Sequence, residues 1–150
     1  MPEERSNPPP IEIGLRLPNL MFLTRPCREF VSHTLKAQGF DQDQIDEIAL
    51  VCTEVVQNSF EHASDNAWHQ VEIDMRIDEE KWVFRIRDEG KGRLQQEDFD
   101  FSGKGPPSGF KDRGRGTFLI ASFSDKVVVR DAPNGGTEVE ITKYRKAPDQ

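Results

Sequence analysis

The sequence predicts an α+β fold, a two-layer α/β sandwich in which a mixed, mostly antiparallel sheet carries helices on one face. Three observations lead to this prediction. Several segments alternate apolar and polar residues, which is the period of half-buried strands. Other segments place apolar residues at helical spacing. The chain has 150 residues, which is enough for one domain with a core of its own.

The chain is predicted to begin with a strand followed by a helix. Apolar residues alternate from Ile11 to Leu17, and Pro18 ends the alternation. A helix is predicted from about Arg25 to Gln38, because Pro26 suits a first helical turn and Gly39 suits the residue after the last one.

A second helix is predicted to follow and to extend to about Ala63. Asp41 and Gln44, three residues apart, resemble a capping box at its start. The residues that recur at helical spacing and should face the core are Ile45, Ile48, Ala49, Cys52, Val55, Val56 and Ser59.

A hairpin and a long loop are predicted next. Val71 to Ile77 and Trp82 to Ile86 alternate as strands, and Asp78-Glu79-Glu80 forms the turn between them. From Gly90 to Gly114 the chain is rich in Gly, Pro, Asp and Lys and has little periodicity. A loop of that length in a compact domain is usually functional, and we expect it to be a lid.

The C-terminal part is predicted to contain one helix and two strands. The helix runs from Thr117 to about Phe123, and a strand follows from Lys126 to Arg130. Asn134-Gly135-Gly136 is a tight-turn signal, and Val139 and Ile141 mark the last strand.

The composition indicates a soluble globular protein and limits its partners. The formal net charge is −7, whereas a nucleic-acid backbone normally binds a basic face. No apolar run approaches the ~20 residues that a membrane helix needs. We expect a flexible N-terminal tail over residues 1–10, the folded domain over 11–145 and a C-terminal tail over 146–150. Cys27 and Cys52 lack CxxC spacing, so two buried free thiols in a reducing cytoplasm are favoured over a disulfide.

The second helix carries a polar stripe that could be a site. Glu54, Asn58 and His62 recur every four residues, roughly opposite the core face. A solvated surface is the ordinary explanation of such a stripe. Leu50, Val51 and Val55 flank it, however, and indicate that something covers this face. A carboxylate and a carboxamide one turn apart can supply a base and a ligand for a hard cation.

Three glycine-containing turns are the other candidates. The second hairpin strand ends in Asp88, and Gly90 and Gly92 follow, so that backbone can approach a planar ligand while the acid accepts a hydrogen bond. Gly114 and Gly116 open the third helix, whose N-terminal amides would attract an anion such as phosphate. Gly136 and Thr137 begin the last strand. Lys104, Lys111 and Arg113 could add positive charge to the loop.

The order of these features is more restrictive than any one of them. E-x-x-x-N-x-x-x-H on a helix, D-x-G-x-G after a strand, a long loop, G-x-G at a helix start and a final Gly-Thr follow one another. Over about residues 11–144 this order resembles the N box and the two glycine boxes of the histidine-kinase-like ATPases, which have the Bergerat-type ATP-binding fold. Residues 54–62, 87–92, 114–120 and 124–127 resemble the serine-protein-kinase anti-sigma factors, bacterial regulators of sporulation and general stress.

The resemblance implies a role for each matching residue. Glu54 would be the general base that takes a proton from a serine or threonine, and Asn58 would hold Mg²⁺ beside the ATP phosphates. Asp88 would accept a hydrogen bond from the adenine amino group. His62 would orient the helix rather than accept a phosphoryl group. The further nucleotide contacts that the resemblance implies are Gly90, Gly92, Gly114, Gly116 and Thr137.

The resemblance also implies partners. The family forms homodimers that hold a sigma factor, and a STAS-domain anti-anti-sigma protein competes for the complex until it is phosphorylated. Arg25 falls where a partner-binding arginine would lie. Arg115 and Thr117 depart from the small or apolar residues common in the second glycine box, and Gly105-Pro106-Pro107 stiffens the expected lid.

Two alternatives stay open at this point. The chain could be an ATP-binding partner-switch module without kinase activity. It could also be a detached histidine-kinase catalytic domain, which would phosphorylate a histidine.

Overall fold

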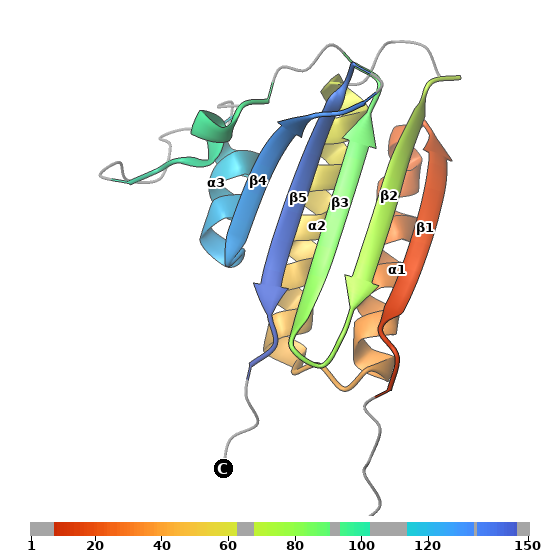
Figure 1. Cartoon of the computed structure of the whole chain (residues 1–150), viewed down its shortest axis with the longest axis vertical. Coiled ribbons are helices and arrows are strands. Elements are labelled where there is room, and N and C mark those ends of the chain that lie inside the picture. Colours follow the sequence, from red (N-terminus) through yellow and green to blue (C-terminus); the bar gives the residue numbers. More distant parts are fainter. Residues whose placement is uncertain (1–7, 63–67, 91–93, 103–113, 134, 147–150) are drawn as a thin grey trace, which may run out of the picture.

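In the part of the chain that the structure describes, five strands form one sheet and three α-helices pack on one of its faces (Figure 1). The computed structural model describes residues 8–62, 68–90, 94–102, 114–133 and 135–146. The sheet order is β1-β2-β3-β5-β4. The strands are β1 Ile11–Pro18, β2 Gln70–Ile77, β3 Lys81–Asp88, β4 Lys126–Asp131 and β5 Thr137–Tyr144.

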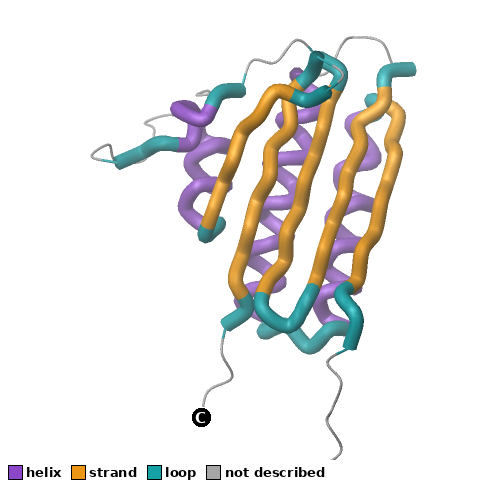
Figure 2. The backbone as a smooth tube through the Cα atoms, viewed as in Figure 1, coloured by secondary structure: helices purple, strands orange, loops and turns teal. Residues whose placement is uncertain are grey.

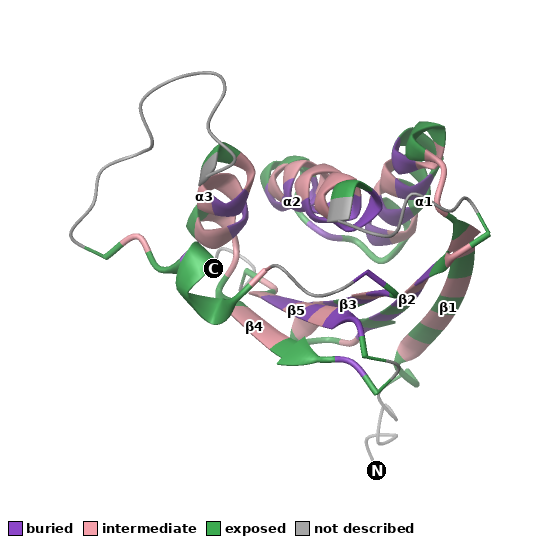
Figure 3. Ribbon diagram, turned by 90° about the horizontal axis from the view of Figure 1, so that it is seen from above, coloured by how far each residue is buried: buried purple, intermediate pink, exposed green. Residues whose placement is uncertain are grey.

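The helices form the second layer of the sandwich (Figure 2). Their bounds are α1 Thr24–Ala37, α2 Gln42–His62 and α3 Gly114–Phe123, with short 3₁₀ turns η1 Met21–Leu23 and η2 Gln96–Phe99. Seen from above, α1 covers β1 and β2, α2 lies over the middle of the sheet, and α3 lies over β5 and β4 (Figure 3). The two-layer α+β prediction is confirmed. All four pairings between the described strands are antiparallel, whereas the sequence analysis expected a mixed sheet with some parallel pairing.

The turn between α1 and α2 follows from Gly39, as predicted. Gly39 has φ +77°, a left-handed conformation that costs little without a Cβ. Its amide donates to the carbonyl of Lys36, and the amide of Phe40 donates to that of Leu35. This is the Schellman arrangement, which satisfies helix carbonyls and stops α1.

The core lies between the sheet and the inner faces of α1 and α2. Its largest side chains without solvent exposure include Leu35, Ile48, Trp82 and Phe84. All the predicted core residues of α2 are buried except Ala49, which is half-buried. Cys27 and Cys52 are both buried free thiols, which confirms the prediction, and their side chains hydrogen-bond to each other across the α1–α2 contact.

The start of α2 differs from the predicted capping box. The side-chain oxygen of Gln44 accepts from the amide of Lys146, and its nitrogen donates to the carbonyl of Tyr144. Both ends of this amide are therefore used to hold the C-terminal segment against α2. Sequence spacing could not separate this long-range use from a local cap, because both require the same residue type.

The base of the long loop is also more ordered than the composition predicts. Gln96 in η2 donates to the carbonyl of Val127 and accepts from the amide of Val129. Its side chain thereby occupies a hydrogen-bonding position on the free edge of β4. Phe101 packs edge-to-face against Phe118 of α3, with 5.2 Å between ring centroids. Among the described residues, no helix is both long enough and apolar enough to span a membrane.

Candidate active site

Four segments that are distant in the sequence meet at one end of the sheet (Figure 1). They are the C-terminal half of α2, the end of β3, the start of β5 and the start of α3. Asp88 is the last residue of β3 and pairs with Thr137, the first residue of β5. The first turn of α3 lies on Glu54 and Asn58 of α2. The structure therefore brings the second glycine box against the N box, and it places Asp88 of the first glycine box beside Thr137.

The polar stripe on α2 is covered by α3, as the apolar residues beside it indicated. A Cβ added to Gly116 would stand 2.8 Å from Oε2 of Glu54 and 3.7 Å from Oδ1 of Asn58. Glu54 and Asn58 are consequently half-buried, while Val51 beside them is 1% exposed. The stripe is the wall of an inter-helix contact and not a solvated surface. His62 ends α2, and its side chain lies outside the described residues.

The environment of Glu54 makes its carboxylate a better proton acceptor than an exposed one. Burial raises the pKa of Glu54, Glu61 raises it further, and the positive charge of Arg115 opposes both. Desolvation has this effect because it disfavours the charged form of an acid. A carboxylate whose pKa is raised toward neutrality is suited to general-base chemistry.

Asn58 has a polar atom without a partner. Its Nδ2 is buried and makes no hydrogen bond to any described residue. Exchange of the nitrogen and oxygen positions of the amide would present a carbonyl oxygen at the same point. A carboxamide oxygen is a hard donor that Mg²⁺ accepts, so Asn58 fits the ion that the resemblance implied.

Asp88 is the most perturbed acid of the site. It is 4% exposed, and burial raises its pKa to about 6, although the backbone amides of Thr137 and Gly90 oppose the shift by donating to the carboxylate. The Gly90 amide lies 3.1 Å from Oδ1. A buried carboxylate at a strand end can accept a hydrogen bond from a ligand amino group. The adenine-binding role that the resemblance implies for Asp88, Gly90 and Thr137 stays a prediction.

The sequence analysis named Gly136 together with Thr137 as a candidate but gave Gly136 no role of its own. A Cβ added to it would stand 1.7 Å from the carbonyl oxygen of Asp88 and 3.1 Å from Cα of Glu89. Only a glycine lets the start of β5 lie this close to the Asp88 turn. The signal was present as the second glycine of Gly-Gly-Thr, but a tight turn explained that pair equally well.

Of the remaining predicted residues, Gly114 and Arg25 are described by the structure and the others lie outside the described part of the chain. Gly114 is the first residue of α3, so the helix opens on the glycine pair and begins earlier than Thr117. Arg25 lies in the first turn of α1, with 81% of its side chain exposed. Residues outside the described part of the chain are Gly92, Lys104, Lys111, Arg113 and the Gly105-Pro106-Pro107 segment.

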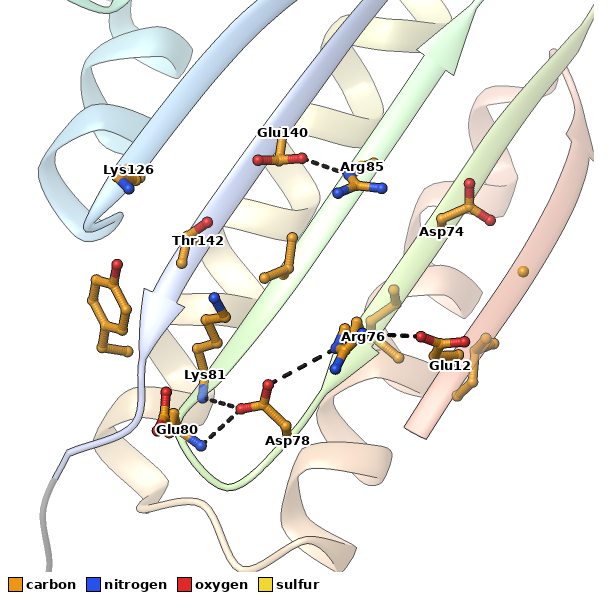
Figure 4. Close-up of a pocket in the computed structure, with 15 residues that line it drawn as sticks. Glu12, Asp74, Arg76, Asp78, Glu80, Lys81, Arg85, Lys126, Glu140 and Thr142 are labelled. Atoms are coloured by element: carbon orange, nitrogen blue, oxygen red, sulfur yellow. Dashed lines mark hydrogen bonds and ion pairs between the residues drawn. The ribbon is translucent and has the colours of Figure 1, made fainter. Parts of the chain in front are cut away.

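A hollow of about 660 Å³ lies on the opposite face of the sheet and is not part of this site (Figure 4). Gly14 and Val83 lie among longer charged side chains there. The charges are largely used within the sheet: Arg85 pairs with Glu140, and Arg76 pairs with Glu12. The hollow is therefore an open, internally neutralised sheet surface.

The fold and the site together define a class of protein. Residues 18–143 match the family of histidine kinase-like ATPase domains, and the chain belongs to that family. Membership implies that the chain binds ATP. The anti-sigma F factor of Oceanobacillus iheyensis is 32% identical over 102 residues, which are 67% of this chain and 70% of that protein. This relationship puts the chain in the same family as that anti-sigma factor.

Two solved structures share the fold. The RsbU and RsbW domains of Rv1364c from Mycobacterium tuberculosis match with a TM-score of 0.62 and 17% identity, over 93% of this chain and 34% of that one. This chain thus spans about a third of that structure. A chain of the SiaB–SiaC complex from Pseudomonas aeruginosa matches with a TM-score of 0.56 and 13% identity, over 88% of this chain and 89% of that one.

Proposed function

We propose that the chain is an anti-sigma factor and an ATP-dependent serine/threonine protein kinase. It would sequester a sigma factor and phosphorylate a STAS-domain anti-anti-sigma protein in the cytoplasm, acting as a homodimer. The identity to a curated anti-sigma F factor supports the regulatory role. One observation carries the kinase assignment. Glu54 is half-buried and lies one helical turn before Asn58, whose side-chain Nδ2 has no hydrogen-bond partner among the described residues.

Glu54 would act as the general base. Its raised pKa allows it to take the proton of a serine or threonine hydroxyl as the oxygen attacks the terminal phosphoryl group of ATP. Phosphoryl transfer depends mainly on positioning and on neutralising charge, so one base on a rigid helix is sufficient protein chemistry. Glu54 lies in the middle of α2, where its backbone is held by intrahelical bonds.

The other residues of the site would bind and orient the nucleotide. Asp88 would accept a hydrogen bond from the adenine amino group. Gly114 and Gly116 would present the first amides of α3 to the phosphates. Asn58 would hold Mg²⁺, which neutralises phosphate charge when it is bound. Gly90, Gly92 and Thr137 would line the adenine side of the site.

The partner surface would include the start of α1. Arg25 is exposed there and pairs weakly with Glu29, 3.9 Å away, so its guanidinium can exchange this contact for an acidic group on a partner. Phe22 is 70% exposed and Phe30 is 42% exposed. A cation beside exposed aromatic side chains is the composition that protein interfaces favour.

One experiment tests the proposal and separates the alternatives. Tagged wild-type protein and Glu54→Gln would be used to capture partners from the native cell with and without ATP, followed by mapping of phosphosites. We expect an acid-stable phosphoserine or phosphothreonine on the captured antagonist with wild type and its loss with Glu54→Gln. Phosphorylation that survives Glu54→Gln would disprove the general base. An acid-labile product would indicate a histidine kinase, and ATP binding without any phosphorylated partner would indicate a binding module.

A further inference from the structure

The carboxylate of Glu54 lies against the N-terminal turn of α3. The surroundings of Gly116 show this contact. A Cβ added to Gly116 would stand only 2.8 Å from Oε2 of Glu54, so the space there is large enough for the glycine hydrogen alone. The first amides of a helix have no intrahelical partner and carry the positive end of the helix dipole. Glu54 therefore places its negative charge beside a helix turn whose amides would also suit a phosphate oxygen.

Arg115 adds a full positive charge at the same point. It is the second residue of α3, next to Gly116, and its charge stabilises the ionised form of Glu54. Arg115 is exposed, so its side chain can reorient without disturbing the core. It also departs from the small or apolar residues expected at this position of the glycine box. The first turn of α3 is consequently more cationic in this chain than the resemblance alone implies.

We propose that Arg115 is a positioning residue that holds Glu54 against α3, and that a nucleotide phosphate competes with Glu54 for this cationic position. The inference rests on the proposed nucleotide site, because the competitor is a phosphate group of ATP. A carboxylate bound by an arginine is a poorer proton acceptor than one released from it. Phosphate binding would thus free Glu54 at the moment when a base is needed.

Competition and simple charge screening make opposite predictions for a double-mutant cycle. If phosphate must displace Glu54 from Arg115, then removing the Glu54 charge helps phosphate binding most when Arg115 is present. If Arg115 merely screens Glu54 from the phosphates, removing the Glu54 charge helps most when Arg115 is absent. The sign of the coupling therefore decides between the two.

The experiment compares wild type, Glu54→Gln, Arg115→Met and the double variant. Dissociation constants would be measured for the non-hydrolysable ATP analogue AMPPNP with Mg²⁺, and for adenosine as a ligand without phosphate. We expect Glu54→Gln to tighten AMPPNP binding roughly three- to tenfold in the presence of Arg115 and less than about twofold in its absence. Adenosine affinity should change less than about twofold in every variant.

Two controls keep the result interpretable. Arg115→Lys retains the charge and should restore most of the coupling, whereas a purely structural role would not be rescued by a different side-chain shape. Urea unfolding would show whether Arg115→Met is folded, and Arg115→Gln would replace it in the cycle if it is not.

The outcomes are distinct. An unchanged AMPPNP constant in Glu54→Gln, or a larger effect without Arg115, would overturn the proposal. If wild type fails to bind AMPPNP, the proposed nucleotide function itself is wrong. If binding and coupling behave as expected but no partner is phosphorylated, the competition stands and only the kinase assignment fails.

Discussion

Gly136 lies directly against the backbone of Asp88: a Cβ on Gly136 would stand 1.7 Å from the Asp88 carbonyl oxygen. This contact joins the start of β5 to the end of β3, which pair as Thr137 and Asp88. The Thr137 amide also donates to the Asp88 carboxylate. The position of Asp88 thus depends on Gly136, because only a residue without a side chain allows this backbone contact.

Gly136→Ala should impair both stability and nucleotide binding. The added methyl group would separate β5 from the Asp88 turn, with a cost of about 1–3 kcal/mol as for other overpacked sites. Asp88 would lose its alignment, so we expect at least tenfold weaker binding of AMPPNP. Gly135→Ala is the matched control: Gly135 has φ +88° but nothing within 4 Å of an added Cβ. It should cost about 1–2 kcal/mol of backbone strain and leave affinity unchanged. Equal affinities in the two variants would refute this account.

Asp88→Asn should stabilise the fold at neutral pH while removing nucleotide binding. Burial raises the pKa of Asp88 to about 6, above its value in the unfolded chain. A raised pKa means that the stabilising contribution of Asp88 is fully present below the unfolded pKa and is lost as the pH rises through 6. Asparagine does not titrate, so the variant should gain about 2 kcal/mol at pH 7.5 and almost nothing near pH 4.

Urea unfolding between pH 4 and pH 8 checks the stability part of this prediction. A difference between Asp88→Asn and wild type that stays constant with pH would mean that the Asp88 carboxyl is not perturbed by burial. Nucleotide binding is measured separately at pH 7.5. There an amide nitrogen in place of the carboxylate would face the adenine amino group, and two donors cannot bond to each other.

The effect of Gly116→Ala on stability should depend on which residue stands at position 54. Alanine favours a helix over glycine by about 0.8–1.0 kcal/mol, but here its Cβ would meet Oε2 of Glu54. In the wild-type background we expect no gain, because the carboxylate must move. In a Glu54→Ala background the obstacle is gone, and Gly116→Ala should stabilise the protein by roughly 0.5–1 kcal/mol. Urea unfolding of the four proteins measures the coupling, and additive effects would mean that Gly116 and Glu54 do not touch.

Arg25→Ala should weaken the complex with a protein partner and leave nucleotide affinity unchanged. Arg25 is highly exposed, so its removal should alter stability by less than about 0.5 kcal/mol. Lys36→Ala removes a cation from the last turn of the same helix and serves as the control. Sizing chromatography of the partner complex and an AMPPNP titration check the two halves of the prediction. A complex that elutes unchanged would remove Arg25 from the interface.

Much of the fold could be predicted because its signals are local. Alternation from Ile11, from Val71 and from Trp82 located three strands close to their observed bounds. Gly39 stopped α1 as expected, since a glycine in the left-handed region is a property of the turn itself. The misjudged features were long-range ones. Gln44 holds the C-terminal segment and Gln96 covers the edge of β4, and no nearby residue reveals either partner.

The sequence by itself determined which elements form and in which order the candidate site residues follow one another. Periodicity, helix stops and glycine turns depend on residues that are close in the sequence, so they can be predicted from the sequence alone. Only the tertiary structure decided what covers the Glu54–Asn58 stripe, because the cover is the backbone of Gly116 in a different helix. It also decided that Gly136 must lack a side chain and that Cys27 meets Cys52. The physical reason is the same in each case: steric exclusion, desolvation and ion pairing depend on distance in space, which packing sets between segments far apart in the chain.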